Sequence, residues 1–103
     1  MNDYFLTPEA EDGLVRTMDY VERVFGLAVA DEVLTHLEVA FERLGRRPGL
    51  GHRRRDLTTN PRIRFWNVGP SLIAYERSEA GITVHLVERA ERNWRRLLRD
   101  RGL

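Results

Sequence analysis

Arginine and tryptophan give one segment of this sequence the chemistry of an anion-binding surface. Arg62, Arg64 and Trp66 alternate with the apolar residues Ile63 and Phe65. In a strand, alternate residues share a face, so the arginines and the tryptophan should project together. Two guanidinium groups beside an indole suit a phosphate backbone with a stacked base, or an acidic peptide. The alternative is a solvated, open face on which arginine side chains cover Trp66. We expect Ile63 and Phe65 to pack on the opposite face, under the helical hairpin that the first half of the chain should form.

A run of three arginines precedes this segment and is the strongest electrostatic feature of the chain. Arg53, Arg54 and Arg55 lie in a stretch that begins with Pro48 and glycines, which predicts a loop. Such a run is usually a solvated loop, but here it could extend the surface of Arg62 and Arg64. No recognition-helix pattern supports base readout in DNA.

The charge of the chain is strongly polarised along its length. The formal net charge is only +1, and all 17 basic residues are arginine. Residues 1–42 hold two arginines against ten acidic residues, a balance of −8, and residues 43–103 hold 15 arginines against six, a balance of +9. A chain of this kind often presents a basic surface to an anionic partner. Alternatively, the two halves neutralise each other within one fold.

The remaining residue types exclude several kinds of site. The chain has no cysteine and no lysine, which excludes disulfides, thiolate metal sites and lysine-dependent catalysis. No pair of its histidines, His36, His52 and His85, has metal-ligand spacing. His85 is the only plausible histidine acid or base, if it reaches the face of Arg62 and Arg64. We therefore expect no metal and no cofactor.

Two amphipathic helices are expected in the first half of the chain. Thr7 and Pro8 give a helix start, with a hydroxyl N-cap followed by proline at the first helical position. Apolar residues then recur every three or four positions, and again after Gly26, which should end the first helix. The stripes are Ala10, Leu14, Met18, Val21 and Phe25, then Val29, Val33, Leu37, Ala40, Phe41 and Leu44. Because the turn between them is short, the helices should form an antiparallel hairpin.

The second half changes to the period-two alternation of strands. We expect strands over residues 62–68, 71–77 and 82–87, joined by tight turns into an antiparallel meander. On the third of these strands, Ile82, Val84 and Leu86 should share one face, with His85 on the other.

The predicted order of elements is β-α-α-β-β-β-α. A short strand over Tyr4–Leu6 begins it, and a terminal helix over residues 93–101 ends it. This order predicts a single α+β domain over residues 1–103, with the helical hairpin packed on one face of a mostly antiparallel sheet. The start of the chain has early acidic residues and no apolar core of a signal peptide, and no apolar stretch is long enough to span a membrane, so we expect a cytoplasmic protein.

The ordered set of these segments resembles the RelE/ParE superfamily of toxins from bacterial type II toxin–antitoxin modules. The resemblance runs from Tyr4 to Leu98 and implies a βααβββ toxin that is neutralised by an antitoxin. The matching segments are residues 4–10, 20–26, 44–57, 72–75 and 82–98.

The two arms of the superfamily differ in chemistry. RelE-like members cut mRNA on the ribosome with a basic cluster and usually a tyrosine or histidine near the C-terminus, whereas ParE-like members poison DNA gyrase. Here no tyrosine follows Tyr75 and no histidine follows His85. Residues 89–94 resemble the ParE-type ending His-Gly-x-Arg-Asp-Trp, but Arg89-Ala90 replaces His-Gly and Asn93 replaces the aspartate. The resemblance thus favours a non-enzymatic, ParE-like toxin that poisons gyrase. The alternative is a RelE-like mRNA endonuclease in which Arg62 and Arg64 clamp phosphate and His85 is the base.

The resemblance also implies a hetero-oligomer with a cognate antitoxin. Because residues 43–103 are basic, we expect the antitoxin to supply an acidic segment that folds on binding. Residues expected to bind the antitoxin or the target are Arg62, Arg64, Trp66, Arg89, Arg92 and Trp94, with Arg53, Arg54 and Arg55 at the rim.

Overall fold

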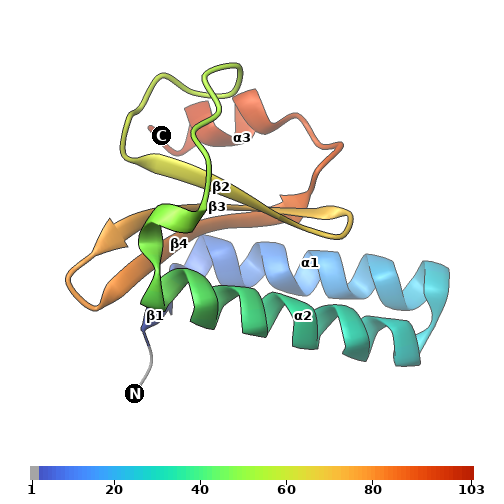
Figure 1. The fold of residues 1–103 in the computed structure, drawn as a ribbon. Coiled ribbons are helices and arrows are strands. Elements are labelled where there is room, and N and C mark those ends of the chain that lie inside the picture. Colours follow the sequence, from blue (N-terminus) through green and yellow to red (C-terminus); the bar gives the residue numbers. More distant parts are fainter. Residues whose placement is uncertain (1–2) are drawn as a thin grey trace.

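The chain folds into three layers: a helical hairpin, a four-stranded sheet, and a short C-terminal helix on the far side of the sheet (Figure 1). A computed structural model describes residues 3–103. In chain order the elements are β1 (Tyr4–Leu6), α1 (Pro8–Phe25), α2 (Leu27–Arg46), the 3₁₀ turn η1 (Pro48–Leu50), β2 (Ile63–Val68), β3 (Ser71–Ser78), β4 (Gly81–Arg89) and α3 (Trp94–Asp100). This α+β architecture confirms the predicted element order.

The hairpin begins and turns where the sequence predicts. The Thr7 hydroxyl accepts a hydrogen bond from the backbone N–H of Ala10 at 3.1 Å, and Pro8 is the first helical residue. Gly26 has φ +94°, a conformation that few other residues adopt, and it separates the two helices. The apolar stripe predicted for the first helix extends beyond the buried core at this turn, because Phe25 is 60% exposed at the tip of the hairpin.

The sheet is mostly antiparallel, with the strand order β1-β4-β3-β2. β2, β3 and β4 form the predicted meander, and β1 pairs in parallel with β4. Arg62 lies before the first residue of β2, whereas β4 extends beyond the predicted strand at both ends. The sheet thus brings the first strand of the chain against its last.

Both faces of the sheet are covered, which corrects the prediction for Ile63 and Phe65. The hairpin packs on one face over a cluster that includes Phe41, Leu44 and Tyr75. Ile63 and Phe65 belong to a second cluster on the other face, beneath Trp94 and Leu98 of α3. The prediction that Ile63 and Phe65 share one face of β2 is confirmed, but the prediction that the hairpin covers that face is wrong. Alternation with a period of two shows which residues share a face, and it does not show which helix packs on that face.

An irregularity in β4 corrects the prediction for its side chains. Ala74 pairs with Leu86 and Tyr75 pairs with Val84, so His85 is an extra residue in β4. Val84 therefore faces the hairpin, whereas Leu86 faces α3. The predicted common face of Ile82, Val84 and Leu86 is wrong beyond Val84.

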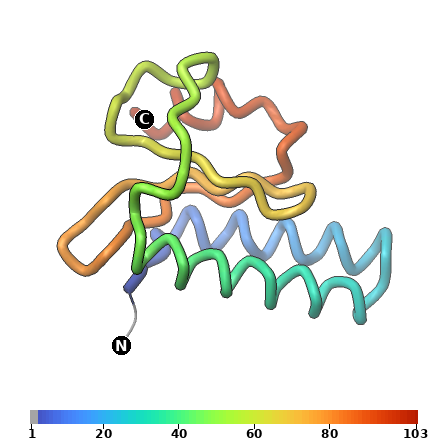
Figure 2. Tube along the Cα trace, viewed as in Figure 1, coloured from blue at the N-terminus to red at the C-terminus, as the bar shows by residue number. Residues whose placement is uncertain are grey.

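The long loop after η1 links the two sides of the molecule. It leaves η1, close to the end of α2, and crosses to the side of the sheet that carries α3 (Figure 2). One isolated bridge fixes it to the edge of the sheet: the backbone groups of His52 and Phe65 exchange hydrogen bonds of 2.9 and 2.7 Å. No helix within residues 3–103 has the length and apolar character needed to cross a membrane.

Candidate functional site

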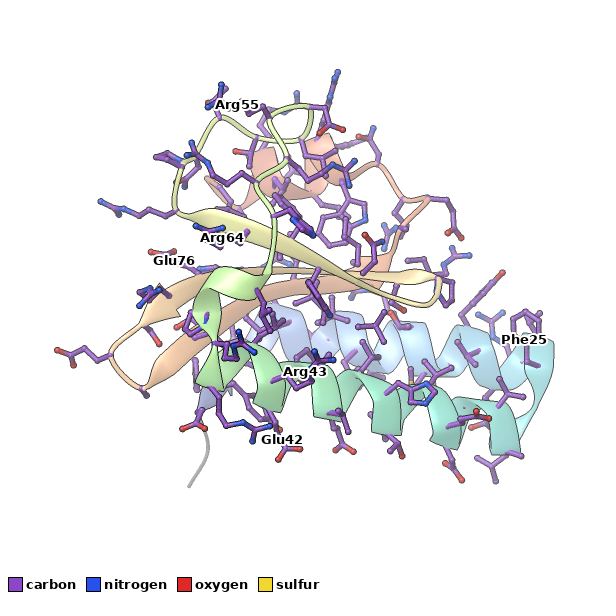
Figure 3. The ribbon with its side chains drawn as sticks, in the orientation of Figure 1. Phe25, Glu42, Arg43, Arg55, Arg64 and Glu76 are labelled. Carbon is purple, nitrogen blue, oxygen red and sulfur yellow. The ribbon has the colours of Figure 1, made fainter. Side chains whose placement is uncertain are left out.

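Loop 52–62 and α3 together form a strongly basic surface. The guanidinium Nε of Arg95 donates to the backbone oxygen of Asp56 at 2.6 Å, and the Thr58 hydroxyl donates to the backbone oxygen of Leu103 at 2.6 Å. A cavity of about 550 Å³ lies between loop and helix. We call this surface the arginine layer; its basic residues are Arg53, Arg54, Arg55, Arg95, Arg96 and Arg99. In Figure 3, Arg55 projects from this end of the molecule and Glu42 from the opposite, hairpin end.

Within the arginine layer, Arg54 differs from its two neighbours. Its guanidinium donates twice to Asp56, through Nε at 3.0 Å and Nη2 at 2.8 Å. This hydrogen bonding lowers the pKa of Asp56 and raises that of Arg54. Arg53 and Arg55 make no ion pair with any other residue of the described chain. Of the three arginines predicted to form the rim of the binding surface, Arg53 and Arg55 are therefore exposed, whereas Arg54 is half-buried and already bound to a carboxylate.

The predicted basic face of β2 is not an open surface. The Nη1 of Arg64 donates to the backbone oxygen of Gly51 at 2.9 Å, which fixes the side chain under the loop. Trp66 is half-buried against the hairpin-side cluster and stacks on His52, with ring centroids 6.0 Å apart. Arg62 is exposed ahead of the strand. Arg64 and Trp66 thus hold the loop against the sheet, and only Arg62 is fully accessible to a partner.

Tyr75 also helps to hold the segment after α2 against the sheet. It is completely buried; its hydroxyl donates to the backbone oxygen of Pro48 at 2.6 Å and accepts from the N–H of Gly51 at 2.8 Å. Burial raises the pKa of this phenol, which is already protonated at neutral pH at its ordinary pKa. The phenol therefore fastens η1 to the sheet.

The three residues of the alternative catalytic site are not brought together. Arg64 lies opposite Tyr75, on the hairpin face of the sheet. His85 lies on the α3 face, where its Nε2 is 3.1 Å from Oε1 of Glu76. A small cavity beside it is lined by Thr7, Glu9 and Arg101. The sheet therefore separates the imidazole from the Arg64 guanidinium.

Trp94 at the end of the chain is a core residue. It is 2% exposed, its indole N–H donates to the backbone oxygen of Arg89 at 2.9 Å, and its ring meets Phe65 edge to face at 6.2 Å. A partner cannot reach this side chain without opening the fold.

Arg89 and Arg92 flank a buried carboxylate that sequence analysis did not single out. Glu88 is 2% exposed and accepts from Arg92 Nη1 at 2.9 Å and from Arg16 Nη2 at 2.6 Å. The hydrogen bond to Glu88 raises the pKa of Arg16. The guanidinium of Arg89 stacks on Tyr20, 3.9 Å from the ring centroid.

Two groups of basic residues were missed as site candidates. Arg16 and Arg23, the two basic residues in the acidic half, are seven apart and so share a helix face with Tyr20, which was a usable signal. Their approach to β4 requires the tertiary structure. Arg95, Arg96 and Arg99 have helical spacing in the predicted terminal helix, and that spacing could have marked them. Within residues 3–103, no group of three or more histidine, aspartate or glutamate side chains could hold a metal ion.

Comparison with known proteins gives the same architecture. The solved structure described as "Chromosomal ParDE TA system from P. aeruginosa" superimposes with a TM-score of 0.71 over 88% of this chain and 98% of that chain, at 17% sequence identity. That likeness establishes the fold. No curated protein sequence matches significantly. The model of the family described as "ParE toxin of type II toxin-antitoxin system, parDE" matches residues 4–94, which is most of the chain. The chain therefore belongs to the ParE toxin family of type II toxin–antitoxin systems.

Proposed function

We propose that this protein inhibits bacterial growth by poisoning DNA gyrase and that a cognate antitoxin neutralises it in the cytoplasm. Membership of the ParE family is the first support. The observation that carries the proposal is the placement of His85 and Arg64 on opposite faces of the sheet. An mRNA endonuclease needs a base and phosphate-binding cations around one ribose and its phosphate, so that both act on the same transition state. A non-enzymatic inhibitor has no such requirement.

The arrangement of Tyr75 supports the same choice. The phenol is fully buried, and its hydroxyl already has two partners, Pro48 and Gly51. A general base or acid must come within hydrogen-bonding reach of the substrate, which Tyr75 does not do in this fold.

The distribution of charge supports an acidic antitoxin segment. Only one ion pair within residues 3–103, Glu9 with Arg101 at 3.2 Å, joins an acid of the first half to an arginine of the second. The acidic hairpin and the arginine layer lie on opposite sides of the sheet (Figure 3). The net positive charge of the second half is therefore largely left unpaired by the acidic half and can attract an acidic segment, whose arginine–carboxylate pairs add specificity.

Expression of the toxin alone in a bacterial host tests this function. We expect growth arrest with induction of a DNA-damage reporter, and the same arrest from the His85→Gln variant. Toeprinting of translating ribosomes is the contrasting readout. Codon-phased cleavage of mRNA in the ribosomal A site, lost in His85→Gln, would establish the endonuclease instead.

A further inference from the structure

A polar cavity of about 260 Å³ lies between α1 and the end of β4, away from the arginine layer. Four arginines line it with two carboxylates, so the lining carries two more positive than negative charges. The charged residues of the lining are Arg16, Asp19, Arg23, Glu88, Arg89 and Arg92, and Thr17 and Tyr20 complete it.

The buried carboxylate of Glu88 holds two of these arginines in place. Its two oxygens bind Arg16 and Arg92, one guanidinium on each. The three groups together carry a charge of +1, and each guanidinium keeps further N–H donors beyond the one that Glu88 accepts. The side chains of Arg16 and Arg92 are 52% and 39% exposed, so these donors can reach a ligand.

The third arginine is fixed by a different contact. Arg89 lies over the ring of Tyr20 and pairs with the exposed Glu91 at 3.0 Å. Arg23, one helical turn beyond Tyr20, makes no ion pair with another residue of the described chain. Guanidinium groups that are already ordered lose little conformational entropy on binding, which favours capture of an anion.

We propose that this cavity receives a carboxylate side chain from the acidic segment of the antitoxin, an inference that rests on the proposed function. A single carboxylate fits the two surplus charges and the bidentate donors of arginine. A nucleic acid strand fits poorly, because its continuous phosphate backbone would have to pass the acidic residues of the same helix. Those residues are Glu9, Glu11, Asp12, Asp19 and Glu22.

Titration of the full-length toxin by NMR tests the site through its arginine Nε–Hε signals. The probe is a blocked peptide of leucine, alanine and glutamate, and its counterpart carries glutamine in place of glutamate. We expect the acidic peptide to shift the Arg89 and Arg92 signals and the glutamine peptide to leave them in place. Equal shifts from both peptides would overturn the proposal, as would no shift from either.

Two variants that each remove one positive charge sharpen the test. Arg23→Gln should weaken binding of the acidic peptide about three- to tenfold, because a charge-assisted hydrogen bond is lost. Arg53→Gln, in the exposed loop, should change it less than about twofold. Equal weakening would indicate unspecific attraction and contradict the proposal. A short DNA duplex that shifts the same signals more strongly than the peptide would assign the cavity to phosphate instead. Neither assay involves gyrase or growth, so its failure leaves the proposed function standing.

Discussion

The carboxylate of Glu88 and the guanidinium of Arg16 join β4 to α1 through a contact of 2.6 Å, and the carboxylate is 2% exposed. Glu88→Gln should lower the free energy of unfolding by about 1–3 kcal/mol, because the amide N–H₂ then faces a guanidinium and leaves buried donors unmatched. Because Arg16 is half exposed, this loss of unfolding free energy should be smaller than the loss from breaking a fully buried ion pair. Denaturant unfolding measures it. Glu91→Gln, at an exposed pair, should stay within about 0.5 kcal/mol and serves as the control.

Replacing each of the two tryptophans with alanine should lower the free energy of unfolding by different amounts. Trp94→Ala removes a buried ring beside Phe65 and should cost about 3–5 kcal/mol of unfolding free energy. Trp66→Ala should cost less, because that ring is only half-buried. Thermal unfolding of both variants checks the order. A Trp94→Ala protein that melts like the parent but no longer binds its partner would show that Trp94 is a binding residue after all.

Sequence periodicity predicted the helical hairpin, the meander and the terminal helix, because each has a local signal in its apolar spacing. It did not predict the side of the sheet on which Ile63 and Phe65 lie, since both faces of the sheet are covered. The extra residue at His85 was also missed, because a bulge depends on the pairing between β3 and β4. The cluster around Glu88 joins α1 to the end of β4 and has no signature in either segment alone.

Gly13 marks the closest approach of α1 to β4. A methyl group there would clash with the backbone oxygen of Val87 and come within 2.8 Å of Oε2 of Glu88. Alanine normally stabilises a helix interior by about 0.5–1 kcal/mol relative to glycine. Here we expect Gly13→Ala to destabilise by about 1–3 kcal/mol, because the helix must move off the strand. Urea unfolding of the variant measures this change. Gly49→Ala, with no atom within 4 Å of its added methyl group, should be almost neutral in the same measurement and serves as the control.

Tyr75 should make stability depend on alkaline pH. Burial raises the pKa of its phenol above 10.0, so the folded state holds the proton more tightly than the unfolded state. This contribution is complete below the ordinary pKa and is lost as pH rises through the folded pKa. Tyr75→Phe should be less stable by about 1–2 kcal/mol near neutral pH, where two hydrogen bonds are lost. It should then lose less stability than the parent above the ordinary pKa.

Denaturant unfolding of the parent and the Tyr75→Phe variant, at neutral pH and at a pH above the ordinary pKa of tyrosine, checks this prediction. Some alkaline loss should persist in the variant, because burial also raises the pKa of Tyr4. An unchanged alkaline slope in Tyr75→Phe would show that Tyr75 does not carry the effect.

The central claim, that this ParE-family toxin acts on gyrase, is tested most directly with purified components. Increasing amounts of the toxin are added to DNA gyrase, ATP and relaxed plasmid, and supercoiled and cleaved DNA are separated on a gel. The account predicts that supercoiling falls and gyrase-dependent cleaved DNA accumulates as toxin increases, with the parent and His85→Gln proteins acting alike. Normal supercoiling at saturating toxin, with no added cleavage, would contradict it.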